Sequence, residues 1–190
     1  HTEVALVAMA EDIYTKHIEP NLWPETVALA HAHLEKGHEV WLVTATPQLV
    51  AQVIADRLGL TGALGTKVEA LDGVFTGALD GPVLHGEEKA VVAGELAQAK
   101  KVDLAECWVY SDSSNDIPLL TMVGNRVVVN PDAKLLAHAK REGWDKFLPE
   151  PILNVIRVKG HYYAVPVNIH MQSWIWYSKA AFKKAGIAKE

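Results

Sequence analysis

A stretch of small polar residues near the middle of the chain carries two carboxylates behind a short apolar run. Residues 107–110 read Cys-Trp-Val-Tyr, which is typical of a buried strand. Asp112 and Asp116 follow, with the carboxamide of Asn115 between them. Open α/β sheets bind ligands beyond the carboxyl ends of their strands, and two close carboxylates repel unless they share a cation or a proton. Such oxygens suit Mg²⁺, which keeps its other coordination places for water and phosphate.

The same stretch has a purely structural interpretation. Pro118 is tolerated in the first turn of a helix, so a short helix is expected to follow, over residues 116–123. Asp112 would then cap this helix, and Asp116 would lie in its first turn, where a carboxylate favours the macrodipole. This stretch alone does not choose between the two interpretations.

Two further polar positions stand where a predicted strand ends or a predicted helix begins. Thr44 and Ala45 follow the apolar run 40–43 and precede Pro47, so a hydroxyl and free backbone N–H groups there can hold a phosphate. An ordinary N-cap is the alternative for Thr44. Lys89 lies at the start of a predicted helix, where a cation opposes the macrodipole, so a partner outside that helix would explain it. A solvated lysine is the alternative.

These positions require an alternating α/β framework. Helical patterns are expected over 1–19, 25–36, 47–58, 87–100 and 132–142, and strands over 39–44, 107–111 and 126–130. Asp72-Gly73 between two apolar runs predicts a β-hairpin within an excursion over 63–84. Strands alternating with helices at this spacing predict a three-layer α/β/α sandwich with a parallel, Rossmann-like sheet. Trp41 and Trp108 fall in strand runs and are expected in the core.

Composition narrows the class of protein. The 190 residues are 49% hydrophobic and 22% charged, which indicates a globular chain with a sizeable core. Cys107 is the single cysteine, so no internal disulfide forms and a cytoplasmic location is expected. Residues 1–150 hold 12 basic and 22 acidic side chains, which argues against a nucleic-acid partner.

The order Thr44, Lys89, then Asp112-x-x-Asn-Asp116 resembles motifs II, III and IV of the haloacid dehalogenase (HAD) phosphohydrolase superfamily. The wording Val-Thr-Ala-Thr-Pro47 and Tyr-Ser-Asp-Ser-Ser-Asn-Asp-Ile-Pro-Leu-Leu120 looks most like subfamily IB, the phosphoserine phosphatase-like group. The resemblance covers roughly residues 1–145 and implies a Mg²⁺-dependent phosphatase, a phosphoric monoester hydrolase acting through an aspartyl-phosphate on a small phosphorylated metabolite. Phosphoserine is one candidate substrate.

The resemblance also assigns roles to the residues. Thr44 and the N–H of Ala45 would bind phosphoryl oxygens, with Asn115 assisting at the phosphate, and Lys89 would neutralise charge as a catalytic residue. The metal ligands would be Asp112, which binds Mg²⁺ directly, and Asp116, which acts through water or by orienting Lys89. This is positioning and charge neutralisation for phosphoryl transfer.

One family motif does not match. Motif I, Asp-x-Asp-x-Thr, supplies the nucleophile and the acid/base, and the nearest string is Glu11-Asp-Ile-Tyr-Thr15 in a helical pattern. We interpret residues 1–22 as the end of the helical cap of this subfamily, 23–148 as the core domain and 149–190 as a basic tail. The nucleophile is expected in a segment before residue 1, and these 190 residues alone are expected to be inactive.

The tail, residues 151–190, carries six basic residues, one acid and six of the 14 aromatic residues. A hairpin around 159–160 and an apolar helical stripe from Met171 are expected there. The stripe fits a peripheral helix on an anionic membrane, or a helix that packs on its own domain or on a second subunit. A second hypothesis for the whole chain follows: a non-catalytic phosphate- or metal-binding domain that serves as an interaction or membrane-targeting module.

Overall fold

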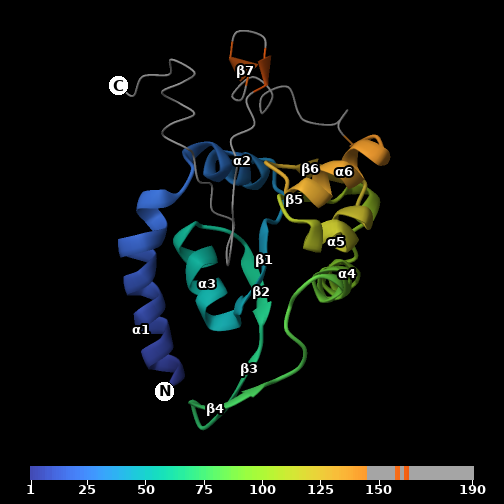
Figure 1. The fold of residues 1–190 in the computed structure, drawn as a ribbon. Helices are drawn as coiled ribbons and strands as arrows, with labels where there is room; N and C mark the ends of the chain where they lie inside the picture. The colour runs from blue at the N-terminus through green and yellow to red at the C-terminus, as the bar shows by residue number, and fades with distance from the viewer. Residues whose placement is uncertain (145–156, 159–160, 163–190) are drawn as a thin grey trace. The chain divides into compact units, whose positions relative to one another are not determined.

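The structure is a computed structural model that describes residues 1–144, 157–158 and 161–162 (Figure 1). The chain divides into two compact units, His1–Lys100 and Lys101–Glu190. The first unit contains the helices α1 (Glu3–Ile13), η1 (Tyr14–Ile18), η2 (Glu19–Asn21), α2 (Pro24–Glu35), α3 (Gln48–Arg57) and α4 (Glu87–Lys100). Its strands are β1 (Trp41–Pro47), β2 (Gly62–Thr66), β3 (Val68–Leu71) and β4 (Val74–Leu79).

The centre of the first unit is a parallel strand pair with one crossover helix. β1 and β2 pair in parallel, from Trp41 opposite Gly62 to Val43 opposite Leu64, and α3 connects them. Ala51 and Ala55 of α3 pack with Ala63 of β2 in a small buried cluster. Because alanine side chains are short, α3 lies close against the sheet, and the strand ends are held in place.

β2 is an element that the sequence interpretation missed. Residues 62–66 read Gly-Ala-Leu-Gly-Thr, with few of the β-branched residues that mark strands. The two glycines are needed for packing: a Cβ at Gly62 would lie 2.6 Å from the Trp41 ring, and one at Gly65 would lie 2.7 Å from the carbonyl oxygen of Thr46. The excursion predicted over 63–84 therefore begins with a strand of the parallel pair.

The predicted hairpin is confirmed. β3 and β4 pair antiparallel around Asp72 and Gly73, whose φ angles are 50° and 74°, as a two-residue hairpin turn requires. The chain start lies along this hairpin, because Thr2 forms an antiparallel bridge with Val74.

The predicted N-terminal helix is also present, but its last turn is π-helical. Tyr14 and Ile18 of η1 are buried. Arg57 of α3 lies over the Tyr14 ring, 4.6 Å from its centroid, and forms an ion pair of 2.9 Å with Glu11. The π-helical turn, α1 and α3 are thus held together by one arginine.

The second unit repeats the strand–helix–strand pattern. It contains η3 (Leu104–Glu106), β5 (Trp108–Ser111), η4 (Ser114–Asp116), α5 (Ile117–Thr121), β6 (Asn125–Val128) and α6 (Ala133–Arg141). β5 and β6 pair in parallel from Trp108 opposite Asn125 to Ser111 opposite Val128. The core cluster is formed by Leu120, Leu135, Ala139 and Trp144.

The prediction that Trp108 belongs to the core is wrong, because its side chain is 42% exposed on β5. The α/β class with parallel strands is confirmed.

Within the tail, the structure describes only β7 (Arg157–Val158) and β8 (His161–Tyr162), which pair antiparallel around residues 159–160. The aromatic stripe from Met171 lies outside the described residues. In the described ranges 1–144, 157–158 and 161–162, every helix is too short or too polar to cross a bilayer.

Candidate functional site

Thr44 and Ala45 lie where the regular pairing of β1 with β2 ends. The register is continuous to Val43 and then shifts before Pro47. The Thr44 hydroxyl is buried; it accepts the N–H of Thr46 at 3.2 Å and donates to the Thr46 hydroxyl at 3.0 Å. Pro47, not Thr44, is the N-cap of α3. The ordinary N-cap interpretation of Thr44 is therefore wrong. Its hydroxyl instead shapes residues 44–46, the irregular carboxyl end of β1 before α3, which is called the loop of Thr44 below.

Gln48 fixes the beginning of α3 against β2. Its side-chain amide donates to the carbonyl oxygen of Ala63 at 3.0 Å and accepts the N–H of Gly65 at 2.6 Å. No sequence motif marks this residue. The loop that carries Thr44 and Ala45 is thus held by side-chain hydrogen bonds from both of its ends.

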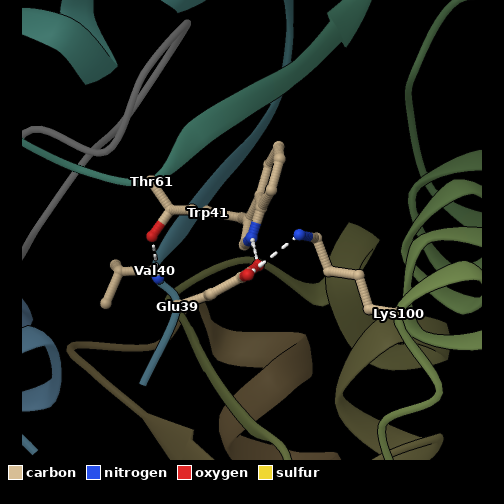
Figure 2. Close-up of polar contacts among 5 residues, drawn as sticks. All are labelled: Glu39, Val40, Trp41, Thr61 and Lys100. Carbon is tan, nitrogen blue, oxygen red and sulfur yellow. Dashed lines mark hydrogen bonds and ion pairs between the residues drawn. The ribbon is translucent and has the colours of Figure 1, made fainter. Parts of the chain in front are cut away.

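Lys89 is the third residue of α4, and its side chain is partly buried. The other end of α4 is tied to the amino end of β1 (Figure 2). Lys100 forms an ion pair of 2.8 Å with Glu39 and lies 5.3 Å from the centroid of the Trp41 ring. Glu39 in turn accepts the indole N–H of Trp41 at 2.9 Å. The hydrogen bond from Lys100, and after it the one from Trp41, stabilise the charged carboxylate of Glu39. They hold its pKa below the usual value.

Asp112, Asn115 and Asp116 lie together on the loop between β5 and α5, as predicted. Ser113, rather than Asp112, caps the first turn: its hydroxyl accepts the N–H of Asn115 at 3.3 Å. Asp116 stands at the N-cap of α5 but makes no side-chain capping bond there. The structural interpretation of Asp112 as a helix cap is therefore wrong. Asp116 does lie in the first turn of η4, directly before α5, as that interpretation expected, but without a side-chain capping bond.

The buried carboxylate of Asp116 is held by a serine at the end of β5. Ser111 donates to Asp116 Oδ2 at 2.7 Å, and the same hydroxyl accepts the N–H of Ser113 at 3.1 Å. Beside it, burial raises the pKa of Tyr110 to about 12, so its phenol stays neutral at ordinary pH. Ser111 thus orients one of the two predicted metal ligands.

Asp132, at the N-cap of α6, supports the same loop from β6. Its carboxylate accepts the N–H of Ser114 at 2.6 Å and those of Lys134 and Leu135 at 2.9 and 2.8 Å. Partial burial alone would raise the pKa of Asp132, but these N–H donors outweigh it and the pKa lies below the usual value. An aspartate before a helical pattern is a recognisable N-cap signal, so the capping role of Asp132 could be predicted from the sequence. Its bond to Ser114 spans 18 residues and could not be predicted.

The donor chemistry of the second unit fits Mg²⁺. Among the residues that the structure describes, no three His, Cys, Asp or Glu side chains come together as a complete metal cage. Two carboxylates and a carboxamide on one loop are what Mg²⁺ uses when water and substrate phosphate supply its remaining ligands. Thr44, Ala45 and Lys89 belong to the first unit, and Asp112, Asn115 and Asp116 to the second.

Comparison with known proteins identifies the class. The family model of haloacid dehalogenase-like hydrolases matches residues 1–121. This is more than half of the chain, so the chain belongs to that hydrolase family, as the motif order predicted.

Individual relatives agree with this assignment. The chain is 49% identical over 140 residues to phosphoserine phosphatase SerB1 of Mycobacterium tuberculosis H37Rv. The matched region covers 74% of this chain and 46% of that protein. A crystal structure of a protein of unknown function from Bordetella pertussis Tohama I matches with a TM-score of 0.70 and 34% identity, over 76% of this chain and 66% of that one. The chain spans about half the length of the curated relatives it matches.

A shorter match is of another kind. A probable sugar-binding periplasmic protein of Brucella suis biovar 1 is 48% identical over 48 residues, which is 25% of this chain and 11% of that protein. So small a part of that protein carries no function over to this chain.

Proposed function

We propose that this chain is the core of a Mg²⁺-dependent phosphatase that hydrolyses a small phosphate monoester through an aspartyl-phosphate. The observation that carries the proposal is the segment from Asp112 to Asp116, in which Ser111 holds the Asp116 carboxylate and neither aspartate makes a side-chain capping bond. Family membership and the resemblance to a phosphoserine phosphatase support it. Phosphoserine is accordingly the first substrate to test.

In this proposal the first unit binds the phosphoryl group. The hydroxyl of Thr44 and the N–H of Ala45 donate to phosphoryl oxygens. To do so, Thr44 turns its proton away from the Thr46 hydroxyl, to which it donates now at 3.0 Å. Lys89 supplies positive charge to the transferring phosphoryl group, whose oxygens gain charge in the transition state.

The second unit holds the metal. Asp112 binds Mg²⁺ directly, Asp116 binds it through water or orients Lys89, and Asn115 assists at the phosphate. When bound, Mg²⁺ would neutralise phosphoryl charge. Ser111 keeps the Asp116 carboxylate from rotating, since its hydroxyl is already engaged at 2.7 Å.

The nucleophile is the remaining part of the proposal. An Asp-x-Asp-x-Thr string does not occur in these 190 residues, so the nucleophilic aspartate is proposed to come from sequence outside them. The 190-residue chain alone should then bind phosphate weakly and turn over no substrate.

The experiment is a phosphatase assay on the protein with its natural N-terminal sequence and, in parallel, on the 190-residue chain. Phosphoserine and p-nitrophenyl phosphate are supplied with Mg²⁺ or with excess chelator. Mg²⁺-dependent turnover by the longer protein only is the expected result. Binding of phosphate by both forms with turnover by neither would instead favour a non-catalytic binding module.

A further inference from the structure

Thr66, the last residue of β2, is a buried hydroxyl that joins two segments distant in sequence. Its side chain is 5% exposed. It donates to the carbonyl oxygen of Ala45 at 2.8 Å and accepts the N–H of Leu84 at 3.0 Å. A hydroxyl has one proton to donate, so these two bonds use the donor and an acceptor position at once. Leu84 is only 4% exposed, so the Thr66 hydroxyl and the N–H of Leu84 both lie where water does not replace a lost partner.

The first of these bonds orients the loop that carries Thr44. A peptide unit is planar, so fixing its carbonyl and its N–H fixes its orientation. In the unit between Ala45 and Thr46, Thr66 holds the carbonyl oxygen at 2.8 Å, and the hydroxyl of Thr44 holds the N–H at 3.2 Å. Because this N–H occupies an acceptor position of the Thr44 hydroxyl, the proton of that hydroxyl must point elsewhere.

The second bond fixes the approach to the helix of Lys89. After Leu84 the chain turns through Gly86, whose φ is 58°, into α4. The N–H of Lys89 donates to the carbonyl oxygen of Gly86 at 3.2 Å. Lys100 holds the far end of α4 to Glu39, before β1 (Figure 2). The bond at Leu84 therefore ties the beginning of α4 to the carboxyl end of β2, on the side of the strand pair where Thr44 lies.

We propose that Thr66 is a positioning residue that sets the loop of Thr44 and Ala45 and the start of the Lys89 helix in one fixed arrangement for phosphate. The inference rests on the proposed function. Thr66 touches no reacting atom in this account, and it acts through the backbone of Ala45 and Leu84.

The chain provides a matched control for this proposal. Thr61 stands just before β2, and its hydroxyl accepts the N–H of Val40 at 2.8 Å (Figure 2). Both threonines thus join the β1 and β2 segments through a hydroxyl, Thr61 at the amino end and Thr66 at the carboxyl end. The substitution Thr61→Val removes the same chemical group from the end of the strand pair that carries none of the proposed phosphate-binding residues.

The experiment compares wild type, Thr66→Val, Thr66→Ser and Thr61→Val in the protein with its natural N-terminal sequence. The inhibition constant of inorganic phosphate and the KM for p-nitrophenyl phosphate are measured at saturating Mg²⁺. Thr66→Val is expected to raise both constants about tenfold, as loss of about one buried hydrogen bond implies. Thr66→Ser, which keeps the hydroxyl, and Thr61→Val should stay within about twofold of wild type, again less than one hydrogen bond.

Equal phosphate constants in Thr66→Val and Thr61→Val would overturn the positioning role. If Thr66→Val does not fold, Thr66→Ser decides: a tenfold loss with the hydroxyl kept would also overturn it, and retained affinity with retained protection of the Leu84 N–H from hydrogen exchange would support it. A wild-type protein with neither phosphate inhibition nor turnover would overturn the proposed function itself. That result is distinct from the two variant outcomes that would overturn the role of Thr66 alone.

Discussion

Hydroxyl side chains fix much of the backbone around the residues proposed for chemistry. Ser111 bonds to Asp116, Thr44 bonds to Thr46, and Thr66 bonds to Ala45. Each of these hydroxyls is buried or partly buried, where a hydrogen bond has little competition from water. Short neutral side chains thus order the segments that carry Thr44 and Asp116, together with the carboxylate of Asp132 at Ser114.

Ser111→Ala tests this view in the second unit. Removal of the hydroxyl releases Asp116 Oδ2 from a bond of 2.7 Å. We expect the Mg²⁺ concentration for half-maximal turnover to rise about fivefold, which corresponds to about 1 kcal/mol for one hydrogen bond. A titration of activity with Mg²⁺ measures it. Thr121→Ala is the control, since that hydroxyl donates to the carbonyl oxygen of Ile117 at the exposed side of α5, and an equal rise there would contradict the assignment.

His33 gives a pH dependence of stability. Burial, followed by the neighbouring His38 and Lys36, lowers the pKa of His33 below its usual 6.5. The unfolded chain therefore binds a proton at this residue at a higher pH than the folded chain does. The free energy of unfolding should therefore be highest above a pH of about 6.5, and it should fall as the pH drops from there toward the pKa of His33 in the folded chain.

Chemical denaturation at several pH values between 5 and 8 measures this effect. His33→Gln should make the free energy of unfolding less dependent on pH over that range, by less than one bound proton. His31→Gln serves as the comparison because His31 bonds to the carbonyl oxygen of Leu58 instead of to another histidine. An unchanged pH dependence in His33→Gln would contradict the prediction.

The sequence could predict that neighbouring residues share a site, but not the long-range hydrogen bonds that hold them in place. Asp112, Asn115 and Asp116 fall within five positions, so any fold that ends a strand at Ser111 brings them into one loop. The bonds from Thr66 to Leu84 and from Asp132 to Ser114 each span 18 residues. No local pattern marks such pairs, because they depend on how β2 and β6 are placed.

At the scale of elements, hydrophobic periodicity located the helices well and missed one strand. The helices predicted to end at residues 36, 58 and 142 end within one residue of those positions, and each is followed by a glycine with a positive φ angle, Gly37, Gly59 and Gly143. β2 was missed because its pattern is dominated by small residues that close packing demands. Its absence from the prediction also hid Thr66, which depends on the carboxyl end of that strand.

Gly65→Ala should disturb the loop of Thr44 through β2. A Cβ there would lie 2.7 Å from the carbonyl oxygen of Thr46 and 2.8 Å from Cα of Gln48, both backbone atoms that cannot rotate away. We expect a loss of stability of about 1–3 kcal/mol from overpacking, together with weaker phosphate inhibition. Thermal unfolding and the phosphate inhibition constant measure the two effects.

Gly37→Ala is the comparison for that variant. No atom lies within 4 Å of a Cβ at Gly37, but its φ is 79°, so only conformational strain of about 1 kcal/mol is expected. Phosphate inhibition should then be unchanged. A Gly65→Ala protein with wild-type phosphate affinity would show that the approach of β2 to this loop is not needed for binding.

At the scale of the whole molecule, the six candidate site residues all lie between Thr44 and Asp116, and the family match ends at residue 121. The acidic body and the basic tail, 149–190, also differ in charge. Neither observation places a boundary at residues 148–149, so the division between core and tail stays a prediction. The predicted boundary near residue 22 depends on a cap that sequence before residue 1 would supply.

Removal of residues 149–190 tests the separateness of the tail. We expect the phosphate inhibition constant and the Mg²⁺ dependence to stay within about twofold, because the described contacts that hold the site lie in residues 1–144. Sedimentation with anionic liposomes, before and after truncation, tests the proposed membrane role. A tenfold loss of phosphate affinity on truncation would show that the tail belongs to the site.

The central claim is that this chain supplies the phosphate- and Mg²⁺-binding part of a phosphatase. The most direct measurement is the Mg²⁺-dependent turnover of phosphoserine by the protein with its natural N-terminal sequence, its intact mass determined on the same sample, and the same assay on Asp112→Ala. The account predicts a mass above 20.8 kDa and turnover that Asp112→Ala abolishes. A folded protein that turns over equally well with Asp112→Ala, or that shows no turnover at any Mg²⁺ concentration, would contradict it.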